Sequence, residues 1–163
     1  MKRVEEEPIL TEEGYKKILE ELKYLKEVKR QEVAEKIQEA RALGDLSENS
    51  EFEAAKEEQA LLEERIARLE TLLYNAKVVK AEDLVLDQVS VGTKVLVLDE
   101  STGGEESFII VGNSEEVDPF SGKISSKSPL GSRLLGRKRG DRVEIKLRNG
   151  SKAVYEILDI VVP

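Results

Sequence analysis

The sequence predicts an α+β protein in which an antiparallel coiled-coil helical hairpin precedes a small, mostly antiparallel β-sheet domain with one short helix. Three observations predict this fold. Apolar residues recur with a heptad period through two segments of similar length before residue 77. Glycine and small polar residues around Gly44 separate these two segments. After residue 77 the apolar period falls to about two, and turn residues become frequent. We therefore expect one domain over residues 1–77 and a second over residues 78–163.

The first predicted helix starts after Thr11, which is its expected N-cap. Glu12 and Glu13 stand in the first turn, where the helix dipole favours negative charge. The apolar seam of this helix runs through Tyr15, Ile18, Leu22, Leu25, Val33, Ile37 and Ala40. It passes polar Lys29 with an interval longer than a heptad allows, so we expect the coiled coil to unwind locally there. Gly44 ends the helix.

The second predicted helix begins within Ser47–Glu51 and has a more regular seam. Its apolar positions alternate in steps of three and four through Phe52, Ala55, Gln59, Leu62, Ile66, Leu69, Leu73 and Ala76. Because only a short turn joins the two helices, they must pair antiparallel. This arrangement places Asp45, Glu48 and Glu51 at the tip of the hairpin.

The second half of the chain reads as short strands and turns, after a mixed linker from Val78 to Asp87. The expected strands are Lys94–Asp99, Ser107–Val111, Lys123–Ser126, Arg142–Leu147 and Lys152–Val161. Asn149-Gly150 is a strong hairpin signal between the last two strands. Ser128-Pro129 opens the one short helix, with serine as N-cap and proline in the first turn.

Composition restricts the chemistry open to this chain, which has no cysteine, no histidine and a net charge of −8. Without cysteine there is no disulfide framework and no thiolate metal site. Without histidine the commonest general base and transition-metal ligand are missing, so a metal would need oxygen ligands and would be a hard ion such as Mg²⁺. A protein that wraps nucleic acid through its phosphates is basic overall. We therefore expect a protein partner, or contact with nucleic acid through a local patch.

The location expected from the sequence is the cytoplasm. No apolar run is long enough to span a bilayer, so we expect no membrane partner. The N-terminus lacks the apolar core of a secretion signal.

The acidic tip has two explanations from the residues alone. Asp45 and Glu48 have the spacing of a capping box, in which each side chain satisfies a free backbone N–H. Alternatively, the carboxylates of Asp45, Glu48, Glu51 and Glu53, with no basic residue before Lys56, would attract a divalent cation. Two carboxylates do not complete an Mg²⁺ shell, so such a tip would deliver ligands into the two-metal active site of another protein.

Three runs of the sequence together resemble the bacterial Gre transcript-cleavage factors. They are Gly44–Phe52 with Ala54-Ala55-Lys56, Ile124–Gly131 with Leu134–Asp141, and the opening Leu10–Tyr15. They cover almost the whole chain in the order of that family. Leu46 after the aspartate is similar to the GreA branch, and Phe52 stands where the family usually has tyrosine.

The resemblance implies a mechanism. The hairpin would enter the secondary channel of a backtracked bacterial RNA polymerase, where the extruded RNA 3′ end blocks elongation. Asp45 and Glu48 would help to hold an Mg²⁺ shared with the polymerase active site, and the polymerase would cut its own transcript. Asn49, Ser50, Glu51 and Phe52 would be supporting tip residues. The chain itself would be no enzyme, with no stably bound cofactor and no small-molecule substrate.

The second half resembles the FKBP-like domain of the same family, which would dock on the rim of the channel. The docking residues that the resemblance implies are Ser128, Pro129, Leu130 and Arg137. Prolyl isomerase activity is not expected, because Phe108, Phe120 and Tyr155 are too few aromatics to line an isomerase pocket.

Two basic clusters have open interpretations. Lys23, Lys26 and Arg30 share one helix face, which either contacts nascent RNA or is a solvated face paired with Glu20, Glu27 and similar neighbours. The second cluster lies around the short helix and comprises Arg133, Arg137, Lys138, Arg139 and Arg142. It either meets an acidic surface of the polymerase or solubilises the edge of the domain.

Two rival functions share the predicted architecture. One is a channel-binding transcription inhibitor that does not stimulate cleavage. The other is a structural coiled-coil adaptor whose tip residues serve only as helix caps.

Overall fold

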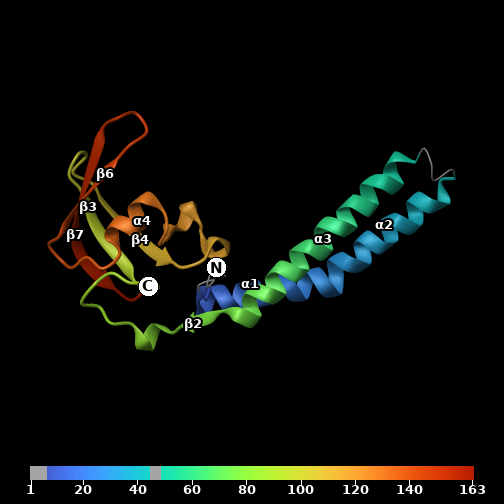
Figure 1. The fold of residues 1–163 in the computed structure, drawn as a ribbon, viewed down its shortest axis with the longest axis horizontal. Coiled ribbons are helices and arrows are strands. Elements are labelled where there is room, and N and C mark those ends of the chain that lie inside the picture. The colour runs from blue at the N-terminus through green and yellow to red at the C-terminus, as the bar shows by residue number, and fades with distance from the viewer. Residues whose placement is uncertain (1–6, 45–48) are drawn as a thin grey trace, which may run out of the picture. The chain divides into compact units, whose positions relative to one another are not determined.

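The computed structural model describes residues 7–44 and 49–163, which fall into two compact units (Figure 1). The helical unit comprises Tyr15–Asn75. The β unit joins the N-terminal segment, up to Gly14, to Ala76–Pro163. Packing therefore groups the start of the chain with its second half, whereas the boundary expected from the sequence separates residues 1–77 from residues 78–163.

The helical unit is the predicted antiparallel hairpin. The first arm consists of α1 (Glu12–Tyr24), a π-helical turn (Leu25–Lys29) and α2 (Arg30–Ala42). The second arm is α3 (Ser50–Asn75), which lies beside α2 (Figure 1). Most of the predicted seam is buried, namely Ile18, Leu22, Val33, Ile37, Ala40, Ala55, Leu62, Ile66 and Leu69.

The π-helical turn lies where the spacing between apolar residues of the first arm is too long for a regular α-helix. The step from Leu25 to Val33 exceeds two α-helical turns by about 0.8 residue. In the structure the backbone N–H of Arg30 donates to the carbonyl of Leu25, five residues back. This wider turn takes up roughly one extra residue and returns Val33 to the seam. The irregularity expected near Lys29 thus takes the form of a π turn.

The β unit contains a five-stranded sheet in the order β5-β4-β3-β7-β6. Its strands are β3 (Lys94–Asp99), β4 (Glu105–Val111), β5 (Lys123–Ser125), β6 (Arg142–Lys146) and β7 (Lys152–Val161). Only the β4/β5 pair is parallel within this sheet. The predicted bounds of β3 and β7 are confirmed, and β4, β5 and β6 are shifted slightly at one end.

The short helix α4 (Pro129–Leu134) packs on the sheet and closes its core. The buried core residues are Val89, Val95, Val97, Ile110, Leu134, Val143, Ile157 and Ile160. The predicted N-cap is confirmed, since the hydroxyl of Ser128 accepts from the N–H of Gly131 at 3.0 Å and donates to the carbonyl of Ser125 at 2.6 Å. Gly131 lies so close to β5 that an added Cβ would be 2.0 Å from that carbonyl.

A two-stranded parallel sheet was not predicted. It pairs β1 (Ile9–Thr11) with β2 (Lys77–Val79), the segment that the sequence placed at the start of a linker. The N-cap role of Thr11 is confirmed, because its hydroxyl accepts from the N–H of Gly14 at 3.1 Å. No helix in the described ranges is both long and apolar enough to cross a membrane.

Gly131→Ala should destabilise the β unit, because the new methyl group would collide with the carbonyl of Ser125. We expect the free energy of unfolding to fall by about 1–3 kcal/mol, as for other overpacked sites. Urea denaturation followed by circular dichroism measures the change. Ser132→Ala, at an exposed position of the same helix, is the control and should stay near the wild-type value. Equal stability of the two variants would contradict the proposed close approach.

Candidate functional site

The tip of the hairpin is the candidate site, and the structure describes its two flanks. The predicted metal-binding residues Asp45 and Glu48 lie outside the described residues. Their assignment therefore stays a prediction. What the structure does define is how α2 ends before them and how α3 begins after them.

Asn49 caps α3 and connects it to α2. Its side-chain carbonyl accepts a hydrogen bond from the N–H of Phe52 at 3.0 Å, and its backbone carbonyl accepts from the N–H of Glu53 at 3.1 Å. Both contacts are those of a helix N-cap. The side-chain amide of Asn49 also donates to the carbonyl of Ala40, close to the end of α2. The capping box that the sequence allows at Asp45 and Glu48 lies outside the described residues, and α3 itself is capped by Asn49.

Phe52 lies half-buried in the first turn of α3, with the guanidinium of Arg41 over its ring at 5.8 Å from the centroid. This cation–π contact joins the end of α2 to the start of α3. The cation–π contact uses the face of the ring and needs no hydroxyl, so phenylalanine can make it as well as tyrosine. This role of Arg41 was not predictable from the sequence, because no local spacing relates Arg41 to Phe52.

The remaining tip residues are Ser50 and Glu51, both exposed in the first turn of α3. Glu51 and Glu53 give this turn an acidic character that suits the positive end of the helix dipole. Among the residues that the structure describes, no group of three or more acidic side chains is placed to hold a metal ion. The described residues therefore add no metal site of their own to the two predicted carboxylates.

The basic face of the first arm makes ion pairs across the hairpin. Arg30 donates two hydrogen bonds of 2.8 Å to the carboxylate of Glu63, and Lys26 lies 3.1 Å from Glu70. The hydrogen bonds from Arg30 hold the pKa of Glu63 below its ordinary value. The partners are thus on α3, and the predicted neighbours Glu20 and Glu27 were the wrong choice for these two residues. A contact of Lys23, Lys26 and Arg30 with RNA stays a prediction.

The predicted docking residues occupy both ends of α4. Ser128 is the N-cap, Pro129 is exposed in the first turn, and Leu130 packs partly against the core. Arg137 follows the helix, and its Nε donates to the carbonyl of Arg133 at 3.3 Å. Pro129 and Arg137 thus offer the solvent-exposed part of this set.

The second basic cluster is partly committed to internal ion pairs. Arg139 lies 2.6 Å from Asp159, and Arg142 pairs with Glu100. Arg133, Arg137 and Lys138 are exposed around the end of α4. These three residues are the part of the cluster that remains available to an acidic partner surface.

Two family models match the chain. Residues 8–78 match "Transcription elongation factor, N-terminal", and residues 83–161 match "Transcription elongation factor, GreA/GreB, C-term". The chain is 59% identical to transcription elongation factor GreA of Thermoanaerobacter pseudethanolicus over 142 residues, which cover 87% of this chain and 90% of that protein. It is 50% identical to GreA of Bacillus licheniformis over 145 residues, covering 89% and 91%.

Among solved structures, the chain is similar to GreA factor homolog 1 (Gfh1) of Thermus thermophilus at 30% identity. The alignment covers 95% of this chain and 99% of that chain with a TM-score of 0.44. Because this superposition is loose, the family assignment stands on the family models and the sequence relatives.

Asn49→Ala should destabilise the helical unit, because it removes both the cap of α3 and the bond to Ala40. We expect a loss of about 1 kcal/mol or more in the free energy of unfolding, measured by urea denaturation and circular dichroism. Asn49→Asp keeps a capping oxygen, loses the amide donor and adds a negative charge that the N-terminus of a helix tolerates, so it should lie between alanine and wild type. Ser50→Ala is the neighbouring control. If alanine costs no more at 49 than at 50, the cap is assigned wrongly.

Glu63→Gln should lower the melting temperature near neutral pH, because it weakens the pair with Arg30. A carboxylate whose pKa is lower in the folded than in the unfolded chain stabilises the fold above the unfolded pKa, and this contribution is lost as pH falls through the folded pKa. The difference from wild type should therefore begin to shrink as the pH falls through the unfolded pKa of about 4.3, and should vanish only below the lowered pKa that Glu63 has in the folded chain. It should also shrink at high salt.

Melting curves followed by circular dichroism over this pH range measure the effect of Glu63→Gln. Glu57→Gln, exposed on the same helix, is the control. A difference between Glu63→Gln and wild type that persists in acid would show that the stabilisation does not come from the charge of Glu63.

Proposed function

This chain belongs to the GreA/GreB family of transcription elongation factors and is of the GreA type; we propose that it rescues backtracked bacterial RNA polymerase by stimulating the polymerase's own cleavage of the RNA 3′ end. It would act in the cytoplasm. The chain would supply side chains to the polymerase active site and would not be an enzyme by itself. One observation carries the proposal, namely that α3 has its own cap in Asn49.

Because Asn49 caps α3, the metal-binding explanation of the acidic tip is favoured over the capping-box explanation. The first free N–H groups of a helix need acceptors, and for α3 Asn49 supplies one to Phe52. A capping box formed by Asp45 and Glu48 is therefore not required to start this helix. The alternative use of the two carboxylates, as ligands of a divalent cation, becomes the stronger explanation. The same reasoning weakens the adaptor hypothesis, which needed these residues only as caps.

The chemistry of the two carboxylates fits Mg²⁺, which prefers oxygen ligands and usually keeps several waters. Asp45 and Glu48 would contribute ligands to an ion that the polymerase also holds, after the hairpin enters its secondary channel. When bound, such an ion polarises a phosphate and activates water. The task of this chain is to carry the carboxylates to the RNA 3′ end on a hairpin whose two arms are joined close to the tip.

The arms of the hairpin suit this task because they are closed on each other along their length. Apolar residues of both arms are buried between them, and ion pairs such as Lys36 with Glu58 at 3.2 Å flank the seam. Near the tip, Asn49 and the Arg41–Phe52 contact join the end of α2 to the start of α3. Tip residues carried by such a pair can be presented without unfolding the arms.

Asp45→Asn should abolish stimulated cleavage while leaving polymerase binding unchanged. It removes the negative charge that attracts Mg²⁺, and the cap of α3 stays at Asn49. We expect the cleavage rate of arrested elongation complexes to fall by roughly 100-fold or more, with partial recovery at raised Mg²⁺. Shortening of the RNA 3′ end on gels measures the rate, and Glu57→Gln, at an exposed carboxylate of α3 outside the acidic tip, is the matched control.

Cleavage by Asp45→Asn at the wild-type rate would refute the metal role. A wild-type protein that binds the polymerase and slows elongation without shortening RNA would support the inhibitor hypothesis instead. Cutting of RNA by the highly purified chain without polymerase would show that it is a nuclease in its own right.

A further inference from the structure

Phe120 is the most exposed large hydrophobic residue among those the structure describes. Its relative exposure is 102%, against 90% for Tyr74 and 67% or less for the others. A single exposed apolar side chain is ordinary on a protein surface. The backbone that carries Phe120, in contrast, is held from several sides, and this combination calls for an explanation.

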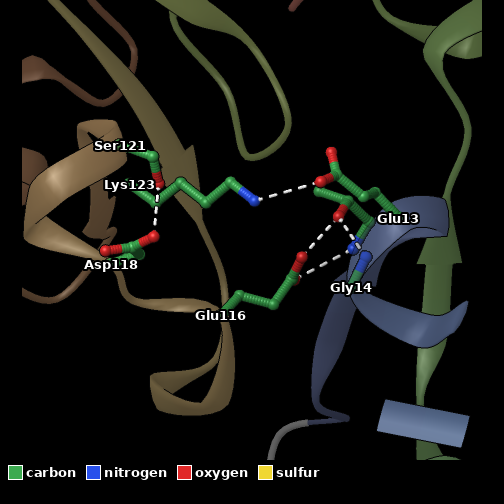
Figure 2. Close-up of polar contacts among 7 residues, drawn as sticks. Glu13, Gly14, Glu116, Asp118, Ser121 and Lys123 are labelled. Carbon is green, nitrogen blue, oxygen red and sulfur yellow. Dashed lines mark hydrogen bonds and ion pairs between the residues drawn. The ribbon is translucent and has the colours of Figure 1, made fainter. Parts of the chain in front are cut away.

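The turn Pro119–Ser121 that carries Phe120 is a capped 3₁₀ turn. The carboxylate of Asp118 accepts from the N–H of Phe120 at 3.1 Å and from the hydroxyl of Ser121 at 2.7 Å, as Figure 2 shows for the second contact. The hydrogen bond from Ser121, which has the larger effect, and the one from Phe120 hold the pKa of the Asp118 carboxyl below its ordinary value. The turn therefore has a defined conformation although its aromatic side chain contributes no packing to it.

The turn is also fastened to the sheet. Asp118 and Lys123 exchange two backbone hydrogen bonds of 3.0 and 2.9 Å, and the carbonyl of Gly122 accepts from the N–H of Ile109 at 2.8 Å. Gly122 has a φ of +73°, and a Cβ there would lie 2.9 Å from the carbonyl of Ser107 on β4. Only glycine fits this position without strain, so the return of the chain from the turn to β5 is fixed.

Side chains hold the same segment to the start of the chain (Figure 2). The buried carboxylate of Glu116 accepts from the N–H of Thr11 at 3.0 Å and from its hydroxyl. The ammonium group of Lys123 lies 3.5 Å from Glu13. Contacts therefore anchor the chain both before and after Phe120, and they leave the ring itself in solvent.

This arrangement has the properties of a binding anchor. Aromatic side chains, phenylalanine among them, are enriched at the buried core of protein–protein interfaces. An anchor on a rigid turn loses little conformational entropy on binding, which improves affinity. The turn also leads directly into β5, an edge strand of about 10 Å, which ends just before the capped turn of Ser128 and Pro129. Phe120 thus lies one short strand away from the segment that the proposed function assigns to polymerase docking.

We propose that Phe120 inserts into an apolar pocket on the surface of RNA polymerase and, with exposed Pro129, anchors the β unit there. This inference rests on the proposed function, since the partner is the one that function requires. It adds a specific anchor residue outside the three runs that resemble the Gre factors. Phe120 contributes to affinity and not to the cleavage step.

The test compares full-length Phe120→Ala and Phe120→Leu with wild type and with Tyr74→Ala, an exposed aromatic control on α3. Binding to bacterial RNA polymerase is measured by surface plasmon resonance. We expect Phe120→Ala to bind about tenfold more weakly or worse, Phe120→Leu to lose less, and Tyr74→Ala to stay within about twofold. Melting temperatures should not change, because Phe120 buries no surface in the chain. At saturating concentration Phe120→Ala should stimulate cleavage at the wild-type rate.

The inference is overturned if Phe120→Ala binds polymerase as wild type does, or if Tyr74→Ala loses as much affinity. It is also overturned if sedimentation shows a wild-type dimer that Phe120→Ala abolishes while polymerase binding persists, because the ring then contacts a second copy. If wild type binds polymerase but does not stimulate cleavage, the proposed function fails, and the affinity ratio still decides the role of Phe120. If wild type does not bind polymerase, both fail.

Discussion

The connection between α2 and α3 through one asparagine is the contact on which the hairpin tip depends. A helix leaves unpaired N–H groups at its start and unpaired carbonyls at its end, and a tight reversal brings both sets together. Asn49 serves both, since its amide donates to Ala40 and its carbonyl accepts from Phe52. The Asn49 side chain therefore fixes where the start of α3 lies along the end of α2. The start of α3 therefore has its N-cap within the described residues, at Asn49.

The fold was predictable wherever a pattern is local and repeated. Heptads located both arms of the hairpin, alternation located β3 and β7, and a serine before a proline located α4. The pair of β1 and β2 was not predictable, because each strand has three residues and no period can be read from so few. Their pairing also joins segments separated by the whole hairpin, a contact that no local pattern encodes.

The candidate site was predicted in part, for a similar reason. The acidic run around Asp45 and Glu48 is conspicuous in the sequence, but its role came from a family resemblance. The capping-box alternative at Asp45 and Glu48 lies outside the described residues. Asn49, which caps α3, was not singled out as a cap because aspartate, serine and asparagine, all good N-caps, occur in close succession there. The partners of Arg30 and Lys26 were misassigned because neighbours on one helix are visible in sequence, whereas pairs between helices depend on how the two helices are rotated.

Backbone pairing between β1 and β2 closes the base of the hairpin. Parallel strands need a crossover connection, and the whole hairpin is the crossover between β1 and β2. The N–H of Lys77, just after α3, donates to the carbonyl of Pro8 at 2.8 Å, and Thr11, which caps α1, is held by Glu116. Because backbone pairing sets where both arms begin and Asn49 joins them near the tip, a slip of one arm along the other would break contacts at both ends. A thin apolar seam is then sufficient to keep the arms in register. The N-terminal strand β1 belongs with the β unit because its partner strand at the base of the hairpin, β2, is part of that unit.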